Sequence, residues 1–104
     1  MSLDVYLTLR KKDVFGYNIT HNLRDMAIKA GAYDLVWHPP EKTKAKTVRP
    51  VLAASISKME SDPDHFRKYN PPNGWGTYED LLQFFREYLE ACEKWPNATV
   101  SAYR

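Results

Sequence analysis

The first residues of the chain alternate between apolar and polar side chains. Every second position from Leu3 to Leu9 carries Leu or Val, and the positions between them carry Asp, Tyr and Thr. Because successive side chains of a strand point to opposite faces, this period of two predicts a β-strand with one buried face. The polar run Arg10–Asp13 then predicts a turn that ends the strand.

Apolar residues recur at helical spacing in the segment that follows. Over residues 19–30 they fall on one face of a helix. Asn18 or Thr20 can cap the start, because either side chain accepts a hydrogen bond from a backbone N–H without a helical partner. Gly31 is typical of a helix C-terminus. The pattern therefore predicts a helix over residues 19–30.

Two longer helices are predicted in the second half of the chain. From Thr47 the apolar residues share one face, and Pro50 falls in the first turn, where its missing N–H costs nothing. A further helix runs from Thr77 to about Lys94. Thr77 and Asp80 have the spacing of a capping box, with Asp in place of the usual Glu or Gln.

The segment Thr99–Tyr103 is typical of a short strand. A lone strand leaves its backbone groups without partners, so we expect it to pair with the N-terminal strand. The sequence therefore predicts an α+β fold in one globular domain over residues 1–104. A small two-stranded sheet, made by the N- and C-terminal strands, would pack against three main helices and a short helical turn at residues 64–68.

Composition narrows the class of protein. Of 104 residues, 43% are hydrophobic and 27% are charged, which is ordinary for a globular domain and disfavours disorder. The net charge of +2 gives no bulk electrostatic argument for nucleic-acid binding. No signal-peptide pattern opens the chain, and no apolar stretch approaches the roughly 20 residues of a membrane helix. The sequence therefore predicts a cytoplasmic protein without a membrane segment.

The loop around Trp75 is the most unusual segment. Two prolines, two asparagines and two glycines surround this Trp in residues 70–76. Such a loop can hold an aromatic ring in a fixed pose beside the N–H groups that open the next helix, which suits a planar or anionic ligand. Asn73 and Trp75 are therefore candidate ligand-binding residues. The structural alternative is that Trp75 fills part of the core.

His21 and Asn22 form a second candidate cluster. At the start of the predicted helix, the helix dipole would lower the pKa of His21 and favour its neutral form. Asn22 would lie at the edge of the buried face, where it can bond to another element. The alternative is a local network that orders the helix start.

Trp37 is the third candidate, because the His38-Pro39-Pro40 run after it is rigid. We expect Trp37 to be partly exposed, as at a contact surface. The alternative is that its side chain holds an irregular connecting segment in place.

The sequence gives little support for a metal site or for a catalytic cysteine. His21, His38 and His65 are too far apart to share a helical turn, so neither a metal site nor a cofactor is expected. The single cysteine, Cys92, lies on the apolar stripe of the last predicted helix, where a thiol is inert.

Three phrases resemble a family of small uncharacterised proteins associated with phages and prophages: Asn18–Leu23, Asn73–Glu79 and Tyr88–Cys92. The resemblance extends over nearly the whole chain and carries no activity with it. It implies that the polar clusters at His21/Asn22 and Asn73–Trp75 belong to a shared design. By analogy, a role in blocking or redirecting a host system becomes more plausible than housekeeping catalysis.

Three function classes remain open. The first is a non-enzymatic binding protein whose pocket for a planar or nucleotide-like ligand combines His21, Asn22, Trp37, Asn73 and Trp75. The second is a protein–protein interaction module that inhibits a host enzyme, with its surface on residues 33–40 and the basic strip 42–49. The third is a small hydrolase or nuclease that uses His21 or His65 as a general base.

Overall fold

The computed structural model describes residues 2–104 and contains a three-stranded antiparallel sheet. The strands are β1 (Ser2–Leu9), β2 (Lys12–Thr20) and β3 (Thr99–Tyr103), in the order β2-β1-β3. Strand β1 is central, and its residue Asp4 lies opposite Tyr103 of β3. The predicted pairing of the terminal strands is confirmed. The predicted two-stranded sheet is wrong, because β2 adds a third strand.

Strand β2 follows β1 through a two-residue turn. Arg10 and Lys11 both have positive φ, at 53° and 67°. A tight hairpin turn needs this backbone conformation, and Asn or Gly usually supplies it. Neither is present at Arg10 or Lys11, so no residue typical of a hairpin turn marks this position. The pairing also shifts register between Leu7 and Thr8, which marks a β-bulge.

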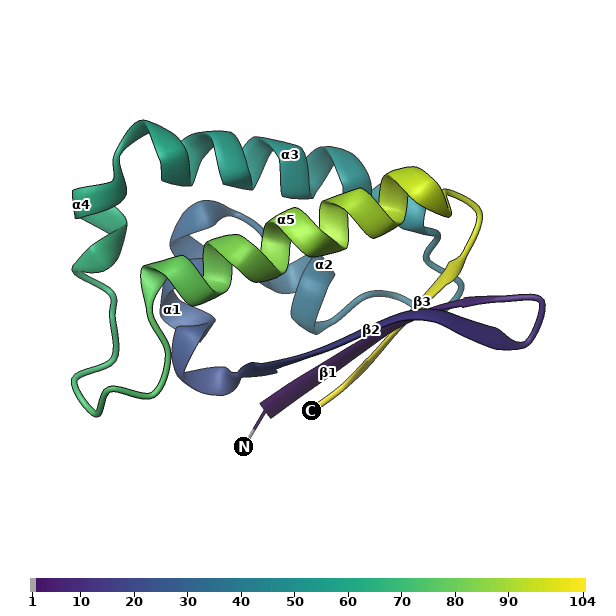
Figure 1. Ribbon diagram of the computed structural model, residues 1–104, viewed down its shortest axis with the longest axis horizontal. Helices are drawn as coiled ribbons and strands as arrows, with labels where there is room; N and C mark the ends of the chain where they lie inside the picture. The colour runs from purple at the N-terminus through teal and green to yellow at the C-terminus, as the bar shows by residue number, and fades with distance from the viewer. Residues whose placement is uncertain (1) are drawn as a thin grey trace.

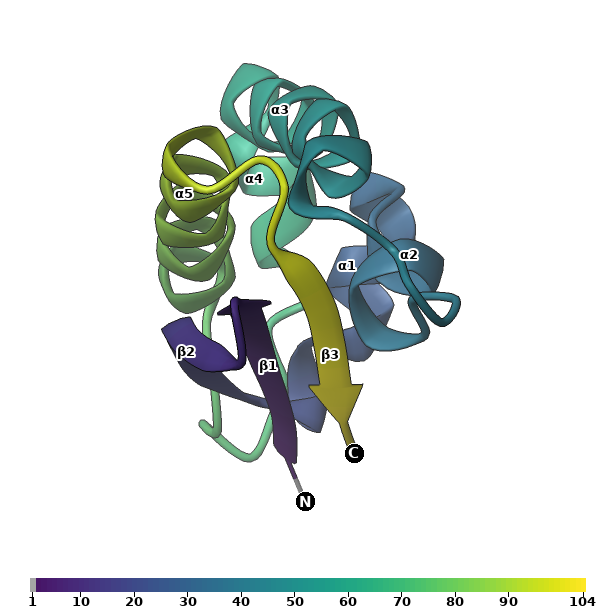
Figure 2. The ribbon, with the colours of Figure 1, turned by 90° about the vertical axis from the view of Figure 1, so that its right-hand side faces the viewer.

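Helices cover one face of the sheet (Figures 1 and 2). Leu3, Val5 and Leu7 of β1 point to this side and are fully buried. The opposite face carries the alternate residues of β1, including Asp4 and Tyr6, which are only partly buried. The helical elements are α1 (Arg24–Ala30), α2 (Tyr33–Trp37), α3 (Ala45–Ser61), α4 (Pro63–Arg67) and α5 (Tyr78–Lys94), with a 3-10 turn, η1 (His21–Leu23), before α1.

The two long helices, α3 and α5, lie side by side over the sheet (Figure 2). Helix α5 starts where the sequence predicted: Thr77 accepts a hydrogen bond from the backbone N–H of Asp80, and the Asp80 carboxylate accepts one from the N–H of Thr77. The predicted helix over residues 19–30 is wrong in its first half, because Ile19 and Thr20 belong to β2. Thr20 still caps η1 by accepting a hydrogen bond from the N–H of Asn22.

Within residues 2–104, no helix combines the length and the apolar character needed to cross a membrane.

Candidate functional site

A polar cavity of about 420 Å³ opens where η1, α2 and the end of β3 meet. Its lining comes from η1, from the first two helices with the residue after them, and from the last residue of the described chain: His21, Asn22, Arg24, Asp25, Tyr33, His38 and Arg104. Two of the sequence-predicted residues, His21 and Asn22, lie in it. A third, Trp37, lies behind it and contacts His21.

The bond between Trp37 and His21 fixes the form of the histidine. The indole N–H of Trp37 donates to Nδ1 of His21 across 3.1 Å. Because indole nitrogen is only a donor, Nδ1 must be without a proton, and the neutral ring carries its hydrogen on Nε2. His21 therefore offers a donor, not an acceptor, at its second nitrogen.

The surroundings of His21 favour this neutral ring. Burial, followed by the nearby positive charges of Arg104 and Arg24, lowers the pKa of His21 from its usual value of 6.5. The sequence predicted a lowered pKa from a helix dipole. The direction is confirmed, whereas burial is the larger cause and η1 is only a three-residue turn.

His38 is held between a guanidinium group and a phenol. Arg104 donates to Nδ1 of His38, and Nε2 of His38 lies 2.9 Å from the hydroxyl of Tyr33. Arginine is only a donor, so Nδ1 accepts and the Nε2–H of the neutral ring donates to Tyr33. The hydroxyl hydrogen of Tyr33 is then left for another acceptor.

The rim of the cavity adds charge. Arg24 lies 3.6 Å from Asp25, and both side chains are exposed. Two guanidinium groups, Arg24 and Arg104, thus face one carboxylate around the opening. Together with the N–H of His21 and the O–H of Tyr33, the cavity presents mainly donors and positive charge, an arrangement suited to an anion.

Trp37 supports this site from below and does not reach solvent. Its side chain is 1% exposed, which corrects the expectation of a partly exposed Trp. The ring stacks on Tyr33 at 5.5 Å and meets Phe84 edge-on at 6.4 Å. A buried ring cannot stack on a ligand, so Trp37 acts here by orienting His21.

Asn73 and Trp75 do not line the cavity. The Asn73 carboxamide oxygen accepts a hydrogen bond from the N–H of Trp75 at 2.9 Å, which shapes the loop. Trp75 is 70% exposed, so the alternative that it fills the core is wrong. The loop is anchored by Gly76, where a Cβ would lie 2.8 Å from the Cγ2 of Thr20.

Sequence reasoning missed Arg24, Tyr33, His38 and Arg104 as parts of one site. Tyr33 is the first residue of α2 and His38 follows its last residue, and the sequence did not predict this helix. Arg104 reaches His38 because β3 runs beside β1, and no short motif encodes that proximity. The expected pairing of the terminal strands was the one signal that could have drawn attention to Arg104.

The remaining candidates lie outside the cavity. Cys92 is buried as predicted, and burial raises its thiol pKa to about 12. His65 lines a separate hollow with Lys29 and Lys58. In the part of the chain from Ser2 onward, no three His, Cys, Asp or Glu side chains gather in a way that could hold a metal ion.

Comparisons of the chain with protein-family models, curated proteins and solved structures gave no match. The resemblance to phage-associated proteins therefore stays a prediction, and any functional argument rests on the chemistry of the cavity.

Proposed function

We propose that the protein is a non-enzymatic binding protein for a small phosphate-bearing, nucleotide-like ligand. The anionic group would lie in the cavity between His21 and His38. The observation that supports this most directly is the direction of the hydrogen bonds. Trp37 and Arg104 occupy the acceptor nitrogens of the two histidines, and the N–H of His38 donates to Tyr33, so the N–H of His21 and the hydroxyl of Tyr33 are left as donors.

The size and charge of the cavity agree with such a ligand. Its volume of about 420 Å³ falls within the usual range for small-molecule sites. Arg24 and Arg104 supply fixed positive charge, and guanidinium groups pair well with phosphate oxygens. Because Trp37 is buried, the phosphate would supply more of the affinity than stacking of a base on that ring.

A hydrolase with His21 as general base fits these contacts less well. A general base needs a free acceptor nitrogen, and the only unprotonated nitrogen of His21 already accepts from Trp37. The interaction-module hypothesis is weakened because Trp37 is buried and cannot contact a partner protein. The basic strip at residues 42–49 is the part of the expected surface that still supports it.

Isothermal titration with inorganic phosphate, AMP and adenosine tests the proposal. We expect phosphate and AMP to bind and adenosine not to bind. Arg104→Gln should weaken AMP binding by at least about tenfold, because it removes a charged donor from the site. Arg49→Gln is the matched control, since Arg49 is exposed and lies 4.0 Å from Glu93, away from the cavity.

Equal affinity for adenosine and AMP would contradict the proposal, as would an Arg104→Gln variant that binds AMP like the wild type. Circular dichroism of each variant would verify that the fold is kept.

A further inference from the structure

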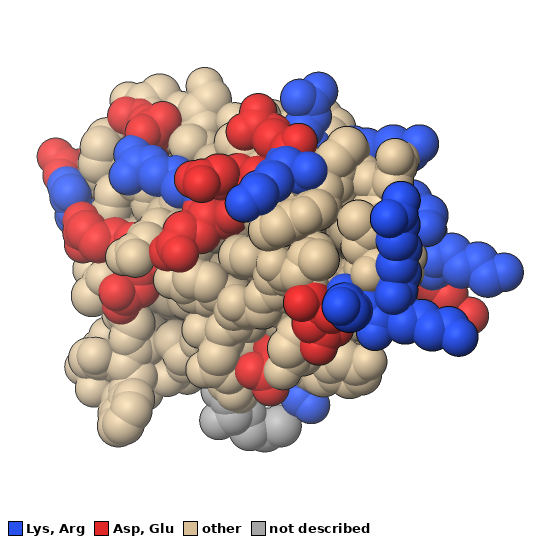
Figure 3. All heavy atoms as spheres, turned by 45° about the vertical axis from the view of Figure 1, so that its right-hand side comes forward, with Lys and Arg blue, Asp and Glu red and all other residues tan. Residues whose placement is uncertain are grey.

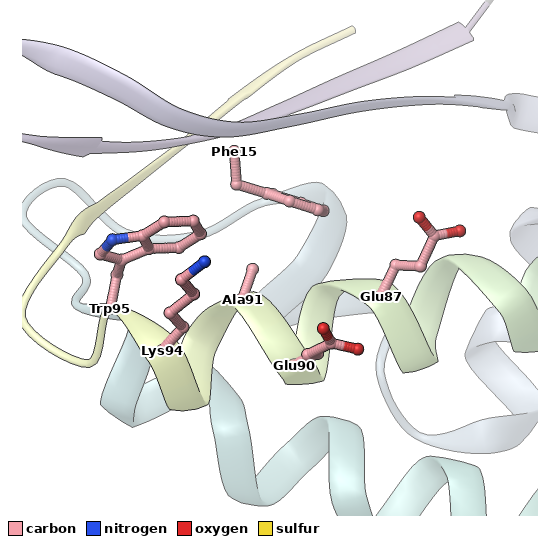
Figure 4. A pocket seen from close by; sticks show the side chains of 6 residues that line it. All are labelled: Phe15, Glu87, Glu90, Ala91, Lys94 and Trp95. Atoms are coloured by element: carbon pink, nitrogen blue, oxygen red, sulfur yellow. The ribbon is translucent and has the colours of Figure 1, made fainter.

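A second, smaller pocket lies between β2 and the C-terminal half of α5 (Figure 4). Its volume is about 200 Å³. Phe15 extends toward it from the strand and Trp95 stands at the end of the helix, with Ala91 between them. Glu87, Glu90 and Lys94 complete the lining. The pocket therefore joins two aromatic side chains to two carboxylates.

Among the described residues, the carboxylates of this pocket are the ones on α5 that lack both a basic partner and a place in the helix cap. Glu79 pairs with Arg67, Asp80 belongs to the capping box, and Glu93 lies 4.0 Å from Arg49. Within residues 2–104, neither Glu87 nor Glu90 has a Lys, Arg or His nitrogen within 4.0 Å. Gln83 donates to one oxygen of Glu87 at 3.0 Å, and the Tyr17 side chain also bonds to Glu87. The Glu87 carboxylate can still accept further hydrogen bonds, and the Glu90 carboxylate is left for a cation.

The position of Lys94 indicates that the Trp95 ring of the pocket attracts a cation. Glu90 precedes Lys94 by four residues, the order that favours an ion pair on a helix. The ammonium nitrogen of Lys94 instead lies over the ring of Trp95, 4.7 Å from its centroid. A cation over an aromatic face is stabilised by the negative charge density of the ring. The chain thus places its own cation where an external one could bind.

We propose that this pocket binds an arginine side chain of a partner protein. A guanidinium group can lie flat against Trp95 or Phe15 while its N–H groups donate to Glu87 and Glu90, which an ammonium group does less well. The pocket is too small for a typical free ligand. An arginine in a chain segment can add contacts along the surface beside it. In doing so it displaces Lys94 from Trp95.

The positive charge around the pocket means that an arginine must be attracted by the residues of the pocket itself. Lys and Arg side chains gather on the same side of the molecule, at the end that carries the β1–β2 turn (Figure 3). The chain as a whole has a net charge of +2. A basic partner therefore gains nothing from the overall charge. Binding of an arginine would have to come from the carboxylates and rings of the pocket.

The test is an NMR titration with a short neutral peptide that carries one arginine between Gly and Ser residues. The matched probe replaces arginine with citrulline, which keeps the shape and removes the charge. We expect the arginine peptide to shift the backbone signals of Ala91 and the indole signal of Trp95 in a saturable way. The citrulline peptide should leave both unchanged.

Three variants locate the interaction. The double change Glu87→Gln and Glu90→Gln should weaken binding by at least about tenfold. Lys94→Met should strengthen it by roughly threefold to tenfold, because it removes a competing cation from Trp95. Glu41→Gln, an exposed acid away from this pocket, should bind like the wild type.

Several results would overturn the proposal. These are the absence of saturable shifts, equal binding of the citrulline peptide, or an undiminished affinity after loss of both carboxylates. Equal or weaker binding by Lys94→Met would show that Lys94 does not occupy the position of the partner. If N-ethylguanidine alone bound as tightly as the peptide, the site would serve a free cation and not a partner protein.

Discussion

Trp37 donates its indole N–H to Nδ1 of His21 across 3.1 Å, and this bond joins the end of α2 to the turn after β2. The buried Trp therefore determines which nitrogen of the partly buried His21 carries the proton. It links the packing of the core to the chemistry of the cavity, because Trp37 cannot move without releasing the acceptor nitrogen of His21.

Trp37→Phe should raise the pKa of His21. Phenylalanine keeps most of the apolar volume but removes the indole donor, so Nδ1 becomes free to take a proton. We also expect the free energy of unfolding to fall by about 1–3 kcal/mol from the lost hydrogen bond and the smaller ring. NMR titration of the imidazole signals measures the first effect, and urea denaturation the second.

The signals of His65, which lies in another hollow, serve as an internal control in the same titration. A His21 pKa that stays unchanged in Trp37→Phe would mean that the indole bond does not hold the ring in its neutral form.

Stability should fall as the pH decreases below about 6.5, in part because of His21. Its pKa is lowered in the folded protein, so below 6.5 the unfolded chain binds a proton that the folded chain does not. This loss grows until the pH reaches the folded pKa and is absent above 6.5. Urea denaturation between pH 5 and pH 7.5 should show this slope, and His21→Gln should reduce it. An identical pH profile for His21→Gln would contradict the assignment.

Gly76→Ala should destabilise the protein more than Gly74→Ala. Both glycines have positive φ, at 105° and 76°, so alanine is strained at either position. At Gly76 the new Cβ would also lie 2.8 Å from Thr20 and 3.0 Å from Leu23, whereas nothing lies within 4 Å at Gly74. We expect a loss of about 1 kcal/mol at Gly74 and at least about 2 kcal/mol at Gly76.

Thermal denaturation of both variants gives the comparison. Equal losses would mean that the loop does not rest tightly on η1.

Tyr88→Phe should leave stability unchanged or increase it by about 1 kcal/mol. The Tyr88 hydroxyl is buried and has no hydrogen-bond partner among residues 2–104, so its removal relieves a desolvation cost. Tyr78→Phe is the contrasting control, because the Tyr78 hydroxyl donates to the Met59 carbonyl at 2.9 Å and its loss should cost about 1–3 kcal/mol. A Tyr88→Phe loss as large as that of Tyr78→Phe would point to an unrecognised partner.

Regular patterning made several elements predictable. The alternation at Leu3–Leu9, the helical stripe after Thr47 and the capping box at Thr77 each predicted an element that the structure contains. In these segments local preference and burial agree. The α+β class followed from them, because two terminal strands and the long helices between them have few ways to share one core.

Strand β2 escaped prediction because its side chains follow no clean period. Only Ile19 is fully buried in it, and Gly16 lies under the ring of Tyr6, where a Cβ would come within 3.2 Å. Its apolar residues near Ile19 fitted a helix equally well. Pairing with β1 decided the outcome, and that is a tertiary effect.

The candidate site was predicted in part. His21 and Asn22 were named and lie in one cavity, and Trp37 touches it from within the core. The expected partial exposure of Trp37 is wrong, and for Trp75 the sequence left a ligand-binding ring and a core ring open, since a Trp beside prolines or glycines gives no local sign of which way it faces. The place of Arg104 in the cavity depends on the pairing of β3 with β1, two strands that lie near opposite ends of the sequence.

That pairing has a consequence for when the cavity comes into being. His21 follows β2, near the start of the chain, whereas Arg104 follows β3 and reaches His38 only once β3 has docked on β1. During synthesis the hairpin and both long helices can be assembled before the last strand emerges. The contact between Arg104 and His38 would then form only at the end of folding, so the anion site that we propose would exist only in the fully folded chain.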